Sequence, residues 1–340
     1  MEKTKVVIIG AGPAGSVCGY LLKKAGVDCV IIDYATFPRE KLCGGGLTPK
    51  AYALLQKLMP NLHYNYQDVK QFRLMMDGAT LCEVDVAKAL RMVSRKDFDH
   101  ALLNQYLALG GQFRQGAFLR YDEQPDGKIT VMLRSGEQWT CDYLIGADGA
   151  NSRVRKQLTG SRPNNMLFLE QYVEKGPNEF VFEFSNRYRK GYYFSFPNIC
   201  WDIVGIGGDY SSAEELRSLL NGKHIREMVP ANDAGLKGAF IGVDTLESGH
   251  PHVMLIGDAG GYANKLTYEG LYYAIATGYN ASKAIIEGVP FSTINHRLYQ
   301  KKKRKEVVLS RLCYSRLGLR LLKLFGRNPK LIKRVFEKYY

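Results

Sequence analysis

A single cysteine precedes a run of glycines in the stretch EKLCGGGL, where Cys43 is followed by Gly44, Gly45 and Gly46. Glycines let the backbone lie against a flat aromatic group, and a thiol beside such a group could donate a proton or tune a redox centre. Cys43 is therefore a candidate catalytic residue. The alternative is a small residue buried in a glycine turn without a chemical role.

A second glycine pattern lies near the N-terminus, where Gly10, Gly12 and Gly15 follow an apolar strand and open an amphipathic helix. In this pattern the first glycine permits a tight turn, the second lets a pyrophosphate approach the backbone, and the third lets the helix lie close to the strand. Asp33 ends the next strand, where a carboxylate can hold an adenosine ribose. The stretch predicts a βαβ unit that binds a dinucleotide, either NAD or FAD.

Two later turns favour FAD over NAD. Asp148 follows a predicted buried strand over 143–147, and Gly257 and Asp258 follow another strand in VMLIGDAGG. Carboxylates at the carboxyl ends of such strands can accept hydrogen bonds from ribityl hydroxyls. A predicted helix that begins near Tyr268 would point the positive end of its dipole at a flavin ring.

The order of predicted elements indicates an α/β fold with an α+β insert. A Rossmann-like, doubly wound FAD-binding domain is interrupted by alternating, aromatic-rich strands, which predict an antiparallel β-sheet substrate domain, and helices follow at the C-terminus. We expect the discontinuous FAD-binding domain to comprise 1–60, 92–160 and 246–296, the substrate domain 61–91 and 161–245, and a basic helical region 297–340.

Taken together, these motifs resemble a known family. GxGxxG, a segment with Arg95, Phe98 and Asp99, then ADG and LIGDA are similar to FAD-dependent oxidoreductases of the aromatic-hydroxylase type. KLCGGGL and GYYFSFP narrow the resemblance to geranylgeranyl reductases. It implies FAD contacts at Ala14, Asp33, Cys43, Gly44, Gly46, Arg95, Leu119, Asp258, Gly270 and Leu271. Arg95 would pair with the cofactor's phosphates, unless it is a solvated charge at a helix start.

The stretch GYYFSFP alternates Tyr192, Phe194 and Phe196 on one face of a predicted strand, with Tyr193 on the other. Aromatic strands usually belong to a protein core, and from the sequence alone that interpretation is favoured. With the family resemblance, Tyr192, Phe194 and Phe196 are candidate substrate-binding residues that wall a channel for an isoprenoid chain.

The resemblance implies an enzyme that moves hydride from reduced FAD to carbon–carbon double bonds of an isoprenoid lipid. Two alternatives stay open: a flavin monooxygenase that uses NAD(P)H and O₂, and a flavin protein that transfers electrons or binds lipid without its own turnover. Hydroxylases of the group usually have a histidine where this chain has Gly261, which disfavours the monooxygenase. No second GxGxxG marks a separate nicotinamide domain, so the electron donor could be NAD(P)H, a ferredoxin or a quinol.

The cysteines and the N-terminus bear on the cell compartment. The seven cysteines form no CxxC pair and no metal-ligand spacing, so we expect reduced thiols, a cytoplasmic protein and no metal site. The chain enters its first strand after a short polar lead, without the apolar stretch of a signal peptide. No apolar run is long enough for a spanning helix.

The positive charge is concentrated in the last 44 residues. Of a net charge of +14, residues 297–340 contribute 15 Lys and Arg against two acids. A single helix would place Val308, Leu312, Leu319 and Leu322 on one face and Arg316, Arg320, Lys323 and Arg327 on an adjacent one. This pattern is typical of a helix that rests on an anionic membrane, here the inner face of the cell membrane. A helical cap on the body and a site for a substrate pyrophosphate stay open, whereas nucleic acid is disfavoured because no recognised binding fold accompanies the charge.

Overall fold

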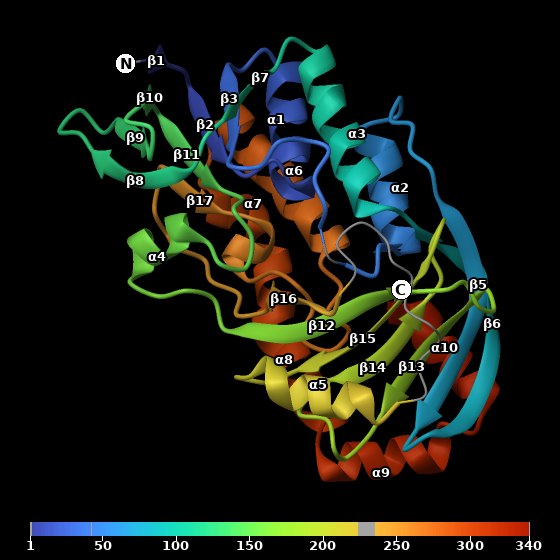
Figure 1. Ribbon diagram of the computed structural model, residues 1–340. Helices are drawn as coiled ribbons and strands as arrows, with labels where there is room; N and C mark the ends of the chain where they lie inside the picture. Colours follow the sequence, from blue (N-terminus) through green and yellow to red (C-terminus); the bar gives the residue numbers. More distant parts are fainter. Residues whose placement is uncertain (1, 42, 224–234, 340) are drawn as a thin grey trace.

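The computed structural model describes residues 2–41, 43–223 and 235–339. Leu42 of the KLCGGGL motif and residues 224–234 of the predicted substrate domain therefore lie outside the described residues. Figure 1 shows a sheet with its helices in the upper part of the molecule and a larger sheet, flanked by further helices, in the lower part. The chain passes between the two parts several times.

The upper part is built on a parallel sheet with the strand order β17-β11-β2-β3-β7. Its central strands read VVII and CVIID, and every residue in them is buried, as expected of parallel strands that are covered on both faces. The strands are β2 (Val6–Ile9), β3 (Cys29–Asp33), β7 (Gln112–Gln115), β11 (Tyr143–Gly146) and β17 (Val253–Leu255).

Helices cover one face of this sheet. Val6 and Ile8 point from β2 into a core shared with the helices on that face. Those helices are α1 (Pro13–Lys24), α2 (Pro49–Leu58), α3 (Arg95–Ala108), α6 (Leu271–Glu287) and α7 (Phe291–Gln300). Helix α6 lies directly against α1, because Gly278 leaves room for the backbone oxygen of Ala14. The start of α6 is three residues later than the predicted start near Tyr268.

The other face carries β-structure where a doubly wound sheet has helices. Val7 and Ile9 pack there against Trp139 and its neighbours in a small sheet of order β1-β10-β9-β8. Its strands are β1 (Glu2–Lys3), β8 (Phe118–Glu123), β9 (Ile129–Leu133) and β10 (Gln138–Cys141), and the short helix α4 (Arg153–Thr159) lies beside β8. The predicted Rossmann-like α/β domain is confirmed, with one helical layer and one β layer.

The lower part is an eight-stranded sheet of order β16-β12-β15-β14-β13-β5-β6-β4, antiparallel except for the pair β13 and β5. The predicted aromatic strands between 165 and 208 are confirmed. The strands are β4 (Gly46–Leu47), β5 (Gln67–Met76), β6 (Ala79–Met92), β12 (Asn165–Val173), β13 (Glu179–Phe184), β14 (Tyr192–Phe196), β15 (Asp202–Gly208) and β16 (Lys237–Gly242). Helix α5 (Ala213–Asn221) covers one face of this sheet.

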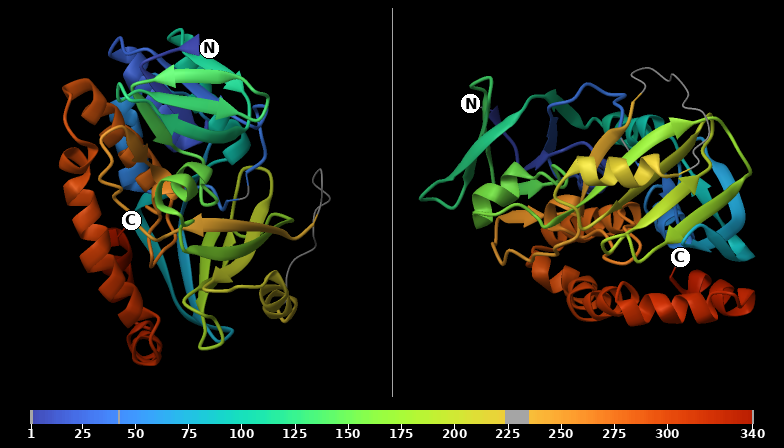
Figure 2. Two further views of the ribbon diagram at one scale, coloured as in Figure 1. Left: turned by 90° about the vertical axis from the view of Figure 1, so that its left-hand side faces the viewer. Right: turned by 60° about the horizontal axis from the view of Figure 1, so that its bottom comes forward.

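The predicted C-terminal helices are confirmed, but the leucines and Val308 expected to share one helix face are divided between two helices. After the π-helical turn η2 (Lys301–Glu306) come α8 (Val307–Cys313), α9 (Arg316–Phe325) and α10 (Pro329–Tyr339). Ser315 starts a new helix by accepting a hydrogen bond from the amide of Gly318, so residues before and after it do not share one face. Figure 2 shows the three helices following one another along the side of the large sheet.

The tail helices pack on the large sheet through a few apolar contacts. Phe336 of α10 is buried, and its ring centroid lies 4.6 Å from that of Phe72 on β5. Leu319 of α9 is buried as well. Across residues 2–41, 43–223 and 235–339, no helix combines the length and the apolar character that crossing a bilayer requires.

Candidate functional site

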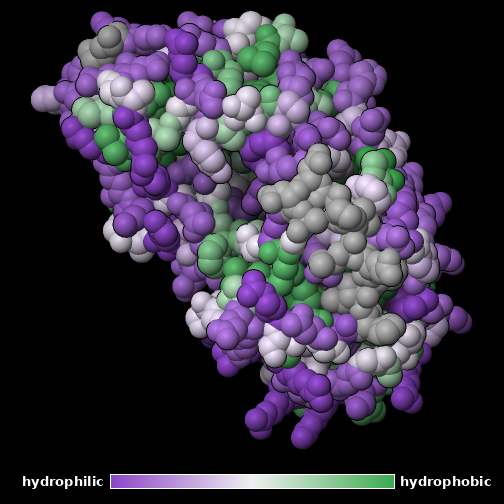
Figure 3. Space-filling model, in the orientation of Figure 1, coloured by the Kyte–Doolittle hydropathy of each residue, from purple (hydrophilic) through white to green (hydrophobic). Residues whose placement is uncertain are grey.

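A cleft of about 940 Å³ lies where the carboxyl ends of the parallel strands face the large sheet. Gly10, Asp33, Asp148 and Gly257 reach it from four strand ends, as the rule for ligand sites in such sheets predicts. Figure 3 shows apolar residues gathered at the waist of the molecule, on a face that is otherwise mostly hydrophilic. The cleft is thus polar toward the parallel sheet and apolar toward the large sheet.

The glycine loop after β2 leaves backbone groups open to the cleft. Gly10 has a φ of +111°, and a Cβ added there would lie 2.3 Å from the backbone oxygen of Ala147. A Cβ on Gly15 would lie 1.9 Å from the backbone oxygen of Gly10, which shows that α1 sits as close to the loop as the motif predicts. Gly12 has free space around it, with the nearest atom 3.6 Å away on Arg39. The N-terminus of α1 is therefore an open anion site.

Asp33 fixes this loop from the neighbouring strand. Its Oδ2 accepts a hydrogen bond of 2.8 Å from the amide of Ala11, and its Oδ1 accepts one of 2.9 Å from the amide of Ala35. The side chain is nearly buried and lines the cleft. Its position at the end of β3 suits a ribose hydroxyl, as the sequence predicts.

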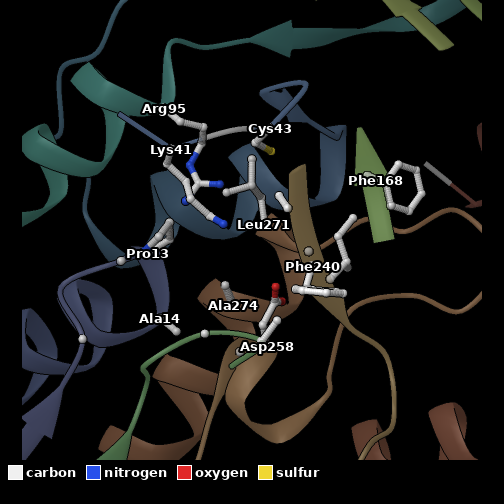
Figure 4. Close-up of a pocket in the computed structure, with 18 of the residues that line it drawn as sticks. Pro13, Ala14, Lys41, Cys43, Arg95, Phe168, Phe240, Asp258, Leu271 and Ala274 are labelled. Carbon is white, nitrogen blue, oxygen red and sulfur yellow. The ribbon is translucent and has the colours of Figure 1, made fainter. Parts of the chain in front are cut away.

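Cationic side chains face the loop across the cleft. Arg95 donates two hydrogen bonds to Asp99, of 2.7 and 2.9 Å, and Arg39 lies 3.3 Å from the same carboxylate. Burial lowers the pKa of Arg95, but the charges of Asp99 and Cys43 and their hydrogen bonds outweigh this effect and raise it above its ordinary value. Figure 4 shows Arg95 and Lys41 reaching into the cavity, with the sulfur of Cys43 beside them. These cations suit the phosphates of a dinucleotide.

The two predicted ribityl-binding carboxylates have different surroundings. Asp148 accepts hydrogen bonds from the Ser152 hydroxyl and from the amides of Arg153 and Val154, so its carboxylate mainly holds the turn before α4. Asp258 instead points into the cavity. Burial raises the pKa of Asp258, and the charges of Lys41 and Arg95 oppose this rise.

The glycines after Cys43 have a packing role. A Cβ on Gly44 would lie 2.3 Å from the ring of Phe196, and one on Gly45, whose φ is +76°, would lie 2.2 Å from the backbone oxygen of Val93. The sulfur of Cys43 accepts a weak hydrogen bond of 3.4 Å from the amide of Gly45. The glycine run thus lets the loop lie against an aromatic face, but that face belongs to the protein's own Phe196.

The aromatic strand β14 lies as the alternation predicts. Tyr192, Phe194 and Phe196 line the cleft, whereas Tyr193 packs on the other face near α5. Phe194 and Phe196 have ring centroids 4.6 Å apart, and Phe180 and Phe182 extend the same wall from β13. The hydroxyl of Tyr192 donates to the backbone oxygen of Thr267, so its ring is held in place. Their role as substrate-binding residues stays a prediction.

The structure brings together most of the residues that the sequence singled out. The cleft is lined by Gly10, Gly12, Ala14, Asp33, Cys43, Gly44, Gly46, Arg95, Asp148, Gly257, Asp258, Gly270, Leu271, Tyr192, Phe194 and Phe196. Gly15 supports the loop from beneath.

Leu119 is not brought to the cleft. Its side chain is 49% exposed on β8, whereas its neighbour Phe118 lines the cleft, because successive side chains of a strand point to opposite faces. Spacing alone could not fix this alternation.

Among the lining residues that the sequence did not single out, three bear on the chemistry: Lys41, Glu170 and Tyr268. Lys41 precedes Cys43 in the quoted motif, so its charge was visible in the sequence. Tyr268 lines the cleft with a φ of +54°, in a conformation that favours glycine, and nothing local in the sequence indicates this. Glu170 interrupts an apolar pattern on β12, and this interruption was the available signal.

These features fit FAD. The open glycine loop and the start of α1 suit a pyrophosphate, Asp33 suits the adenosine ribose, and Asp258 suits the ribityl chain. Gly270 and Leu271 at the start of α6 also border the cleft, so the positive end of this helix faces it.

Comparisons with known proteins agree with this site. Residues 3–173 match a protein family described as FAD binding domain. Geranylgeranyl diphosphate reductase of Rhodobacter capsulatus is 26% identical over 301 residues, which cover 83% of this chain and 75% of the relative. Menaquinone reductase of Mycolicibacterium smegmatis is 28% identical over 325 residues, which cover 84% and 77%.

A solved structure supports the fold. The crystal structure of a geranylgeranyl bacteriochlorophyll reductase-like protein from Thermoplasma acidophilum gives a TM-score of 0.73 at 19% identity, covering 98% of this chain and 90% of that one. The chain therefore belongs to the FAD-binding domain family, its resemblance to the geranylgeranyl reductase family of FAD-dependent oxidoreductases is confirmed, and its cofactor is FAD.

Proposed function

We propose that this FAD-dependent oxidoreductase reduces carbon–carbon double bonds of an isoprenoid lipid. The observation that carries the proposal is the composition of the cleft. One side consists of the glycine loop and strand ends, and the other is an aromatic wall of Phe180, Phe182, Tyr192, Phe194 and Phe196. The hydrocarbon of an isoprenoid suits such a wall. Burying its apolar surface is favourable, and the hydrocarbon has no polar group that would be left without a partner.

The chain's own residues bind, orient and exclude water. Bound reduced FAD supplies hydride, and the protein must hold an alkene carbon within reach of it. Arg95 and Lys41 hold negative charge at one end of the cleft, and the aromatic rings of β13 and β14 position the alkene and keep water away. Cys43 interacts with Arg95, and the adjacent Gly44 packs on Phe196, so a thiol at this position can tune the cofactor or take part in proton transfer.

The tail suits an enzyme whose substrate resides in a membrane. We propose that α9 rests on an anionic lipid surface. Leu317, Leu321, Leu324 and Phe325 follow helical spacing and are exposed, although Leu319 of the same helix is buried against the body. The exposed apolar face lies among the cations of a strongly basic tail, and this combination is complementary to anionic lipid.

Lipid analysis tests the proposed activity. Cells that contain the gene and cells that lack it are compared by mass spectrometry of their total lipids. The proposal expects the deletion strain to contain an isoprenoid lipid that has two fewer hydrogens for each unreduced bond, and expects the wild-type gene to restore the reduced lipid. Identical lipid profiles under all growth conditions would contradict it.

A further inference from the structure

Glu170 is a buried carboxylic acid on the cleft side of the large sheet. Along β12, Leu167 and Leu169 point toward α5, and the alternate positions Phe168 and Glu170 line the cleft. The Glu170 side chain is only 4% exposed. A carboxyl group at a position where the strand pattern calls for an apolar residue is costly and calls for an explanation.

The carboxyl group is incompletely satisfied. Its Oε2 is buried and has no hydrogen-bond partner among residues 2–41, 43–223 and 235–339. Burial raises the pKa of Glu170 to about 7, and the charges of Lys41 and Arg95 oppose this rise. Tyr172 on the same strand and Lys237, the cross-strand partner of Glu170 on β16, are further titratable neighbours. A buried acid that is partly protonated near neutral pH is suited to proton transfer.

Resting on the proposed reductase function, we infer that Glu170 is the proton donor to the substrate alkene. The O–H bond of the Glu170 carboxyl breaks, and its proton forms a C–H bond at one alkene carbon. The π-bond electrons form that bond, and hydride from the reduced flavin completes the other carbon. The lipid gains two hydrogens and two electrons, the flavin is oxidised, and Glu170 is left as a carboxylate that regains its proton from water.

Three other groups of the cleft that could donate a proton, Asp148, Asp258 and Cys43, are less suited to this role. Asp148 holds the turn before α4 through three hydrogen bonds. Asp258 lies on the side of the glycine loop and α6, where the cofactor's ribityl chain is expected. The sulfur of Cys43 already accepts a hydrogen bond from Gly45 and interacts with the Arg95 guanidinium. Glu170 instead shares its sheet face with the aromatic wall.

The test uses the FAD-bound protein, three variants of the cleft and one control variant. Glu170→Gln removes the acid and keeps the shape, Glu170→Asp keeps the acid on a shorter stem, and Cys43→Ala removes the competing donor. Glu214→Gln, at an exposed position on α5, is the matched control for the change of a glutamate to glutamine. Infrared difference spectra between about pH 5 and pH 9 detect the C=O stretch of a buried, protonated carboxyl group without any substrate. Turnover with a geranylgeranyl lipid and chemically reduced protein gives the second readout.

The inference expects a carboxyl band that titrates near pH 7, is absent in Glu170→Gln and persists in Glu214→Gln and Cys43→Ala. It expects kcat to fall by about 10²-fold or more in Glu170→Gln, with FAD still bound and partial recovery in Glu170→Asp. A missing band in the wild-type protein, or wild-type turnover in Glu170→Gln, overturns the inference and leaves the reductase function intact. If the wild-type protein reduces no lipid although the band is present, the proposed function fails instead, and the donor role fails with it.

Discussion

The guanidinium of Arg95 is held by the carboxylate of Asp99 through two hydrogen bonds, of 2.7 Å from Nε and 2.9 Å from Nη2. The two residues are four apart on α3, so the helix itself sets their spacing. Asp99 is fully buried, and Arg39 approaches the same carboxylate at 3.3 Å. One buried acid therefore orients two cations at the cleft wall that faces the glycine loop.

Replacing Asp99 leaves this charge cluster unbalanced. Asp99→Asn is expected to lower the free energy of unfolding by about 3 kcal/mol, because two arginines lose their buried counter-charge. It is also expected to weaken FAD binding, because Arg95 is no longer held in one orientation. Urea denaturation and quenching of flavin fluorescence measure the two effects. Asp97→Asn, exposed on the same helix, serves as the control, and an equal loss in both variants would contradict this account.

The glycine loop allows a sharper comparison between two glycines with positive φ. Gly10→Ala is expected to abolish FAD binding, because the added Cβ would lie 2.3 Å from the Ala147 backbone oxygen. Gly127→Ala meets the same kind of backbone strain, but no atom lies within 4 Å of its Cβ. Gly127→Ala should lower the free energy of unfolding by about 1 kcal/mol and leave FAD binding unchanged. Normal flavin content in purified Gly10→Ala protein would show that the loop is not the pyrophosphate site.

Much of this site was visible in the sequence because its signals are local. Gly10, Gly15 and Asp33 act within one βαβ unit of about 30 residues, so their spacing alone fixes their geometry. Asp258 follows a buried strand, and parallel strands end at one edge of the sheet. The alternation in GYYFSFP likewise predicts the cleft face of Tyr192, Phe194 and Phe196, because the side-chain period of a strand is two.

Other features depend on contacts between distant segments and could not be predicted. The environment of Glu170 comes from Lys41 and Arg95, which are more than 70 residues away in sequence. The packing role of Gly44 depends on Phe196, and no local pattern links the two. In the tail, the spacing of apolar residues correctly predicts helices. It gives no sign that a new helix starts at Ser315. The β layer over Val7 and Ile9 was missed because both layer types bury the same apolar residues.

The stability of the protein should depend on pH through Glu170. Burial raises its pKa from an ordinary value of 4.5 to about 7, so the folded state holds this proton at a pH where the unfolded chain has lost it. Below about pH 4 Glu170 is protonated in both states and does not lower the free energy of unfolding. Between pH 4 and 7 the free energy of unfolding falls progressively. Above about pH 7 the free energy of unfolding has fallen by about 3 kcal/mol. The charges of Lys41 and Arg95 oppose the rise, and Tyr172 and Lys237 are neighbours of Glu170 in the same sheet.

A difference measurement isolates this effect from the other titrating groups. Urea denaturation of the wild-type protein and Glu170→Gln at a series of pH values gives the difference in unfolding free energy. This difference should move in favour of the variant as the pH rises from about 4 to about 7, and should level off above that. A difference that is constant with pH would mean that the pKa of Glu170 is not raised in the folded protein.

The exposed face of α9 should bind anionic lipid. Leu317 and Leu324 are 59% and 71% exposed, so replacing both by glutamate places acids where apolar contact is expected and leaves the buried Leu319 in place. The double variant is expected to lose cosedimentation with anionic vesicles at low salt. Leu107→Glu, at an exposed leucine on α3, should sediment like the wild-type protein. Equal binding to neutral and anionic vesicles, or none to either, would leave the tail as a cap on the large sheet.

The most direct test of the central claim is an anaerobic single-turnover experiment. Protein with bound FAD is reduced chemically, freed of excess reductant and mixed with a geranylgeranyl lipid in detergent, while the flavin absorbance is followed and the lipid is analysed by mass spectrometry. The account predicts that the oxidised flavin spectrum returns without O₂ and that the lipid gains two hydrogens per flavin. A flavin that stays reduced in the presence of geranylgeranyl and other polyprenyl lipids, and returns to its oxidised spectrum only when O₂ is admitted, would contradict it.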